Sequence, residues 1–165
     1  RPQHIAELCI SSVARLQKGL MMATKPESQL WGKLKAGTKD LGVFWTRIES
    51  WSSPGVPDLH GIVDNQPFWL ELKIHKLKSL KSIRLRPHQI SWQTRYAAQN
   101  GNVWNLVTHP PSRTINLFWG GRALEIAGQT DDKGPLEPDW SSGIPSDWKG
   151  MIDMIVLSHD KRKRN

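Results

Sequence analysis

The feature that most constrains the fold of this chain is a pair of strand-like stretches joined by Asp64-Asn65. Asp-Asn is a plausible two-residue hairpin turn, and it predicts that Val63 lies opposite Gln66. Counting outward along both strands from this pair places Asp58 opposite Glu71, with Cβ atoms roughly 4.5–5.5 Å apart. The sequence therefore predicts two carboxylates side by side on one hairpin.

Lys73 adds a positive charge to the same face of the hairpin. Side chains alternate along a strand, so Glu71 and Lys73 lie on one face, while Leu70 and Leu72 lie on the other. Two carboxylates this close resist ionising together unless a cation lies between them. Oxygen ligands favour a hard divalent ion, so we predict a site for Mg²⁺ (or Mn²⁺) on this face.

Each of these residues also has a simpler interpretation. Asp58 could cap a turn after Pro57, and Glu71 and Lys73 could form a weak ion pair on an exposed strand. The run Phe68-Trp69-Leu70 argues against an exposed strand, because it is typical of a buried one, where unpaired charges are costly.

The charge balance indicates a polyanionic partner, nucleic acid first. Lys and Arg number 23 against 15 Asp and Glu, which gives a formal net charge of +8 over 165 residues. The run Lys161–Arg164 supplies four of these charges, but the rest of the chain is still basic.

Residues 75–86 contain no Asp or Glu and follow the Glu71 strand directly. We expect this basic stretch to hold a phosphate backbone, although a mobile solvated loop is the alternative. The side chains expected at nucleic acid are His75, Lys76, Lys78, Lys81, Arg84, Arg86 and His88. For His88, an exposed position at the start of a helix is an equally good interpretation.

The remaining composition excludes several classes. A single cysteine, Cys9, excludes an internal disulfide and fits a reducing setting. No apolar run approaches the roughly 20 residues needed to span a bilayer, and we see no secretory signal. We therefore expect an intracellular protein, in the cytoplasm or nucleoid of the host cell, that has no membrane partner. His and Cys do not cluster at zinc spacings.

Hydrophobic periodicity and turn residues predict an α/β protein. The expected elements are helices over about 25–37 and 87–99, strands over 43–48, 103–107 and 114–119, the two hairpin strands, and a short helix over 123–126. They form a mixed central sheet flanked by helices, in the order αβββαβ. We expect residues 1–24 to be an N-terminal helical extension, with an amphipathic helix over 3–18. Residues 25–119 would form the core, and residues 120–165 an irregular C-terminal extension with a basic tail.

Nine tryptophans are many for a chain of this length. Trp31, Trp45, Trp69 and Trp104 fall in predicted elements and are expected in the core. Trp51 and Trp92 could stack on unpaired bases, although buried packing is the simpler interpretation for Trp92.

Pro57-Asp58, followed after twelve residues by Glu71-Leu72-Lys73, resembles the signature of the PD-(D/E)xK nuclease superfamily. Gly55 lies just ahead of it, as is typical there. Within the superfamily, the chain is most similar to the virus-type replication-repair nuclease (VRR-NUC) group and its Holliday junction resolvase relatives, over about residues 25–119. The resemblance implies a restriction-endonuclease-like core.

The resemblance also implies a role for each hairpin residue. Asp58 and Glu71 would hold the metal ion, and the backbone carbonyl of Leu72 would complete its site. Lys73 would orient the attacking water or help to deprotonate it.

Two further site residues follow from the resemblance. An acidic residue on the first core helix, here Glu27, would ligate a second metal ion or act on the site without contacting a metal ion directly. A Gln on the helix after the lysine strand, here Gln89, would hydrogen-bond a metal-bound water or the phosphate. Without the resemblance, Glu27 is a helix N-terminal acid and Gln89 a surface amide.

The expected function is a Mg²⁺-dependent endonuclease that acts on branched, flapped or otherwise structured DNA in replication, repair or recombination. A non-catalytic DNA-binding protein on the same scaffold and an RNA-directed nuclease are the alternatives. The sequence leaves open whether the chain is a monomer or a homodimer. Its compactness and the start-like Met21-Met22 suggest a viral or mobile-element gene.

Overall fold

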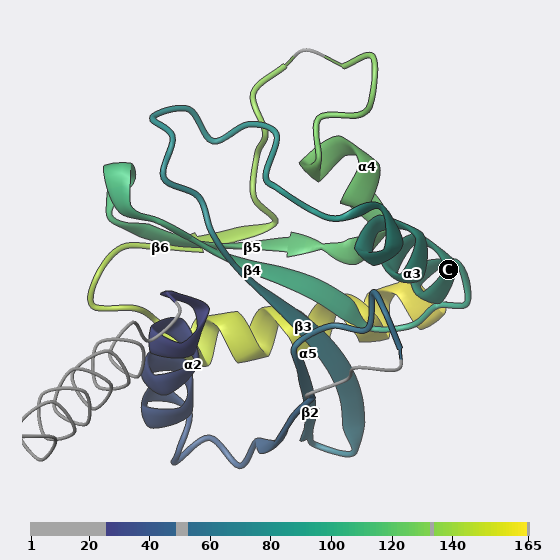
Figure 1. Cartoon of the computed structure of the whole chain (residues 1–165). Coiled ribbons are helices and arrows are strands. Elements are labelled where there is room, and N and C mark those ends of the chain that lie inside the picture. Colours follow the sequence, from purple (N-terminus) through teal and green to yellow (C-terminus); the bar gives the residue numbers. More distant parts are fainter. Residues whose placement is uncertain (1–25, 49–52, 133, 165) are drawn as a thin grey trace, which may run out of the picture.

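Figure 1 shows the computed structural model of the chain, which describes residues 26–48, 53–132 and 134–164. The helices are α2 (Pro26–Gly37), α3 (Pro87–Ala98), α4 (Ala123–Ile126) and α5 (Trp148–Arg164), with two short 3₁₀ turns, η1 (Pro110–Ser112) and η2 (Gly120–Arg122). The strands are β1 (Phe44–Arg47), β2 (Leu59–Val63), β3 (Gln66–Ile74), β4 (Val103–His109), β5 (Thr114–Trp119) and β6 (Trp140–Ser142).

The six strands form one mixed sheet between two layers of helices. They follow the spatial order β1-β2-β3-β4-β5-β6, and only β3 and β4 pair in parallel. Helices α2 and α5 lie against one face, and α3 and α4 against the other (Figure 1). The expected α/β class and the αβββαβ order are confirmed. Within the described ranges, none of the helices has the length and apolar character needed to cross a bilayer.

The hairpin has the register that the sequence predicts. Asp64 and Asn65 both have positive φ, 49° and 60°, as a tight two-residue turn between strands requires. Val63 pairs with Gln66 and Leu59 with Leu70. Asp58 comes just before Leu59, and Glu71 comes just after Leu70. These two residues therefore lie opposite each other at the end of the hairpin that is farther from the turn.

Two hydrophobic cores hold the helices to the sheet. Leu34 of α2 packs with Leu70 of β3 in the first core. Ile83 and Leu85 lie in the second core, under α3 and α4, and the Ile83 N–H donates to the carbonyl of Ile126 at 2.8 Å. The basic stretch is thus anchored at its second half, where buried apolar residues alternate with exposed basic ones.

The C-terminal part of the chain is not the irregular extension expected for residues 120–165. Strand β6 extends the sheet beyond β5, and α5 buries Met151, Ile152 and Ile155 in the first core. The spacing of these three residues matches one face of a helix. A Gly- and Pro-rich segment precedes α5 and continues up to its first residues. The sequence therefore suggested an irregular structure for the whole C-terminal part.

Part of the basic tail is also packed rather than solvated. The guanidinium of Arg162 lies 5.3 Å from the ring centroid of Trp104 and 4.9 Å from that of Trp119. It also donates to the side-chain oxygen of Asn102 at 3.1 Å. A cation over an aromatic ring is attracted by the ring's quadrupole, so Arg162 ties the end of α5 to β4 and β5.

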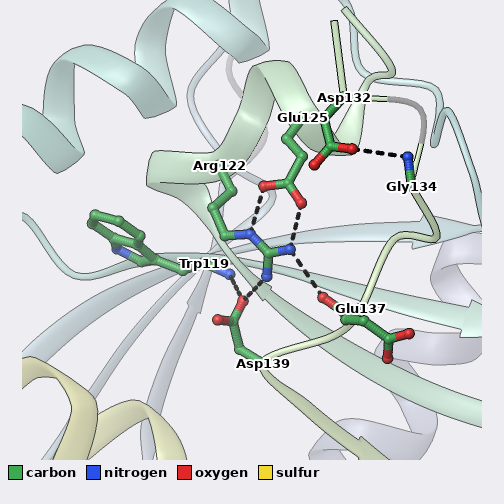
Figure 2. A network of polar contacts seen from close by, with 7 residues as sticks. All are labelled: Trp119, Arg122, Glu125, Asp132, Gly134, Glu137 and Asp139. Atoms are coloured by element: carbon green, nitrogen blue, oxygen red, sulfur yellow. Dashed lines mark hydrogen bonds and ion pairs between the residues drawn. The ribbon is translucent and has the colours of Figure 1, made fainter. Parts of the chain in front are cut away.

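A polar network anchors the segment between α4 and β6 (Figure 2). The Arg122 guanidinium donates to both carboxylate oxygens of Glu125, to Asp139 Oδ2 and to the carbonyl of Glu137. Asp139 Oδ2 also accepts the Trp119 N–H at 2.8 Å. The hydrogen bonds to Glu125 raise the pKa of Arg122, and the same contact lowers that of Glu125. The network is structural, because it fixes the approach of the chain to β6.

Some sequence predictions fall outside the described residues. They are the amphipathic helix over 3–18 and the possible stacking role of Trp51. Helix α2 begins at Pro26 and ends at Gly37, as predicted, with Leu30 and Leu34 buried.

Candidate active site

A hollow of about 430 Å³ opens where β2 and β3 meet the first turns of α2 and α3. It is lined by all five residues predicted to be catalytic: Glu27, Asp58, Glu71, Lys73 and Gln89. Leu72 also lines it, together with Ser28, Arg47 and Arg86. The fold therefore brings the predicted residues together from four elements of the chain.

Glu71 is the most buried charged group in this hollow, with only 1% of its side chain exposed. Its Oε1 accepts from Lys73 Nζ at 2.7 Å and from Gln89 Nε2 at 2.5 Å. Its Oε2 is buried and has no hydrogen-bond partner among the described residues. A buried carboxylate oxygen left without a partner is costly, and a cation is the most direct way to satisfy it.

Asp58 is fixed beside Glu71 through the backbone. Its Oδ2 accepts the Leu72 N–H at 2.9 Å, and its carbonyl accepts the Ile48 N–H at 2.8 Å. Burial raises the pKa of Asp58, against the hydrogen bond from Leu72 and the charge of Lys73. Burial likewise raises the pKa of Glu71 to about 7, with repulsion from Asp58 adding to the shift and Lys73 opposing it. Both carboxyls therefore gain from a nearby positive charge.

These donors fit a hard divalent ion. Mg²⁺ in proteins is usually held by one or two carboxylates and keeps several waters, so Asp58 and Glu71 suffice for it. Within the described ranges, no three His, Cys, Asp or Glu side chains come together as a metal-binding group. Glu27 lines the hollow, and its charge contributes to the raised pKa of Asp58.

Gln89 is oriented at both ends of its amide group. Its Oε1 accepts the Arg86 N–H at 2.9 Å while its Nε2 donates to Glu71. Helix α3 is in turn held to the sheet by reciprocal amide hydrogen bonds of 2.9 and 2.7 Å between Gln93 and Asn105, both fully buried. Asn105 pairs with Glu71 across β3 and β4. Gln89 is thus not a surface amide, and the start of α3 is positioned against the carboxylate pair.

Gly55 allows the loop before Asp58 to approach α3. It has a φ of +93°, and a Cβ at this position would lie 2.3 Å from the carbonyl oxygen of His88. Only glycine fits both the positive φ and the close contact. This explains in physical terms why a glycine just ahead of Pro57-Asp58 matters for the site.

Arg47 is a site residue that the sequence reasoning missed. It pairs with Leu59, whose side chain faces α2, and its Nη2 lies 3.4 Å from Ser28 Oγ. Its charge opposes the rise in the pKa of Asp58. No motif marks Arg47. Arg47 could have been placed near Asp58 only from its position opposite Leu59. That position is known only once β1 is seen to pair with β2.

The structure corrects the role expected for His75. The residue is buried, with 6% exposed, and its Nε2 lies 2.7 Å from the carbonyl oxygen of Ser79. Its ring packs near that of His109, at a centroid distance of 5.6 Å. His75 therefore closes the turn after β3 and is not accessible to nucleic acid.

The other basic residues of the stretch are exposed but do not all face the site. Arg84 and Arg86 line a hollow beside Glu27 and Lys73. Lys81 instead lines a separate hollow near Glu125. Lys76, Lys78 and His88 are exposed to solvent.

Replacing Glu71 with glutamine tests the cost of the buried charge. The pKa of Glu71 is about 7 in the folded protein against an ordinary 4.5, so the folded state binds the proton more tightly. In EDTA, the wild type should therefore lose stability as the pH rises from about 4.5 to 7, by about 3 kcal/mol at most from Glu71. Glu71→Gln should lose less, because this contribution is absent from it. Thermal unfolding between pH 4.5 and 8 measures how the difference in stability between the two proteins changes with pH.

Glu125→Gln is the control of opposite sign. Arg122 lowers the pKa of Glu125, so this variant should be less stable than the wild type above about pH 4.5.

Adding Mg²⁺ at pH 8 should stabilise the wild type but not Glu71→Gln. If the difference in stability between wild type and Glu71→Gln does not change with pH, the prediction is contradicted.

A search of protein-family models finds no match for this sequence, and a search of curated proteins finds none either. Among solved structures, the fold is similar to that of Hjc, a Holliday junction resolvase from the archaeal hyperthermophile Archaeoglobus fulgidus. The TM-score is 0.44 at 13% sequence identity, and the match covers 72% of this chain and 88% of that one.

Proposed function

We propose that this chain is a metal-dependent DNA endonuclease of the PD-(D/E)xK type, which hydrolyses phosphodiester bonds inside a cell. The observation that carries the proposal is the buried Glu71 carboxylate, which has one unpartnered oxygen and lies beside Asp58 and Lys73 in a hollow with arginines at its wall. The sequence motif favours the superfamily. The narrower likeness to the VRR-NUC group depends on that motif together with the positions of Glu27 and Gln89 and the order of the elements.

Asp58 and Glu71 are the residues that would hold Mg²⁺ or Mn²⁺, with the backbone carbonyl of Leu72 as a further ligand. When bound, the ion would polarise the phosphate and lower the pKa of a bound water. Lys73, already paired with Glu71, would orient the attacking water and offset negative charge in the transition state. Gln89 would hold Glu71 in position, since it already donates to Oε1.

The basic side chains around the hollow would hold the DNA backbone. Arg47 and Arg86 line the same hollow as the carboxylates, and Arg84 lines the neighbouring one. Contacts with phosphates give an affinity that depends on salt concentration, and they do not recognise the base sequence. We infer a branched, flapped or otherwise structured DNA substrate from the sequence resemblance.

A cleavage panel tests the proposal. Linear duplex, flap, four-way junction and single-stranded DNA, with RNA counterparts, are incubated with the protein in Mg²⁺, in Mn²⁺ and in EDTA. We expect cleavage of at least one structured DNA in Mg²⁺ or Mn²⁺ and none in EDTA. Cleavage in EDTA would contradict the metal mechanism, and salt-dependent binding without cleavage under any condition would identify a non-catalytic DNA-binding protein.

A further inference from the structure

Three of the polar residues that line the site are each followed or preceded by an aromatic ring on the same face of their strand or helix. These pairs are Asp58 and His60, Glu71 and Trp69, and Gln89 and Trp92. Two residues along a strand, or three along a helix, return to the same face of the element. The rings therefore extend the face that carries the carboxylates and the amide.

The rings contact one another and form a continuous group, the ring cluster, made of His60, Trp69, Trp92 and Tyr96. The centroids of His60 and Trp69 lie 4.7 Å apart, and those of Trp69 and Trp92 lie 5.5 Å apart. Trp92 and Tyr96 are stacked, at 4.7 Å and an interplanar angle of 15°. All four residues are half-buried, including Trp69, which was expected in the core. Aromatic residues of the two cores, such as Phe68 and Phe118, have no exposed surface.

The surroundings of the ring cluster are apolar on one side and basic on another. On the adjacent strands, Phe44 and Ile62 pair with each other and are 68% and 39% exposed. A hollow of about 480 Å³ lies against Trp92 and Tyr96, and Arg95 lines it. The cluster thus combines half-buried aromatic rings with a guanidinium beside them.

We propose that the ring cluster stacks the unpaired bases that adjoin the scissile phosphate, so that the substrate is DNA with single-stranded nucleotides at the cleavage site. This inference rests on the proposed nuclease function and narrows its substrate. Every base has a π-face, so stacking on aromatic side chains tolerates any sequence, and an arginine adds to it. Bases in an intact duplex are already stacked on their neighbours and are not available to these rings.

The charge distribution favours nucleic acid over a second copy of the chain as the occupant of this face. Arg95 lies beside the ring cluster, and Arg47 and Arg86 line the hollow next to it. Two copies that each carry a net charge of +8 repel one another, whereas a polyanion is attracted.

Fluorescence anisotropy in EDTA, where no metal-dependent cleavage occurs, tests the proposal. Three labelled DNAs are compared: a blunt duplex, the same duplex with a single-stranded tail, and that tail built of abasic nucleotides, which keep the phosphates but lack bases. We expect Trp92→Leu to weaken binding of the tailed duplex roughly five- to hundredfold and to leave the blunt duplex unchanged. The abasic tail should lower wild-type affinity by a similar factor, and this comparison needs no variant.

Two variants serve as controls. Trp92→Phe retains a ring and should keep most of the preference for the tailed duplex. Trp140→Leu removes a half-buried tryptophan from the opposite edge strand, β6, and should bind all three DNAs like the wild type.

Three results would overturn the proposal. They are equal affinity of the wild type for the natural and abasic tails, an equal loss by Trp92→Leu on all three DNAs, and a wild-type dimer in sedimentation that Trp92→Leu dissociates. The last result would assign the face to a second copy of the chain. Failure of the nuclease proposal is a separate outcome, since it would appear in the cleavage panel and not in metal-free binding.

Discussion

Lys73→Ala should abolish metal-dependent cleavage, with a rate loss of about 10³-fold or more, while DNA affinity stays within a few fold. Its ammonium lies 2.7 Å from the buried Glu71 and is the one cation paired with that carboxylate in the described structure. Without it, the attacking water and the charge of the transition state lose the ammonium that is paired with Glu71. Single-turnover cleavage at saturating protein measures the rate, and anisotropy in EDTA measures the affinity.

Lys76→Ala is the matched control for this prediction. Lys76 is exposed, three residues farther along the chain. Its removal should weaken binding and reduce the salt dependence, without changing cleavage of bound DNA. Asp58→Ala should match Lys73→Ala in losing cleavage. Undiminished cleavage by both Asp58→Ala and Lys73→Ala would rule out the proposed active site.

Ile155→Ala should lower the free energy of unfolding by about 2–5 kcal/mol, because it leaves a cavity in the first core. Ile155 is fully buried on α5, where Met151 and Ile152 pack into the same core. Leu157 lies on the same helix and is 59% exposed, so Leu157→Ala should change stability by no more than about 0.5 kcal/mol. Urea unfolding followed by tryptophan fluorescence measures both variants. Equal, small effects would mean that α5 is not part of the cooperative folding unit.

The hairpin was predictable because its rules are local. A two-residue turn defines the register of the strands it joins, and strand alternation then decides which side chains share a face. This is why Asp58, Glu71 and Lys73 could be grouped from their spacing. Helices α2 and α3 were predictable from other local signals, a proline at the start of each and a glycine at or just after its end.

Helix α5 and Arg47 were missed for a different reason. The apolar residues of α5 follow a long irregular segment, and only their packing against the sheet shows that the helix completes the core. Arg47 reaches the site through strand pairing and through Ser28 of α2, contacts that no local pattern contains. His75 shows the converse, since a basic-looking position turned out to be a buried one.

Local sequence alone determined the carboxylate pair, the lysine beside it and the basic stretch that follows, because turn geometry and strand period act over a few residues. Tertiary structure decided how deeply Glu71 is buried, that one of its oxygens lacks a partner, and that Gln89 and Arg47 reach the same hollow. Burial and electrostatics depend on elements far apart in the chain. The sequence could therefore place two carboxylates together, and only the packed fold makes their charge costly enough to call for a cation.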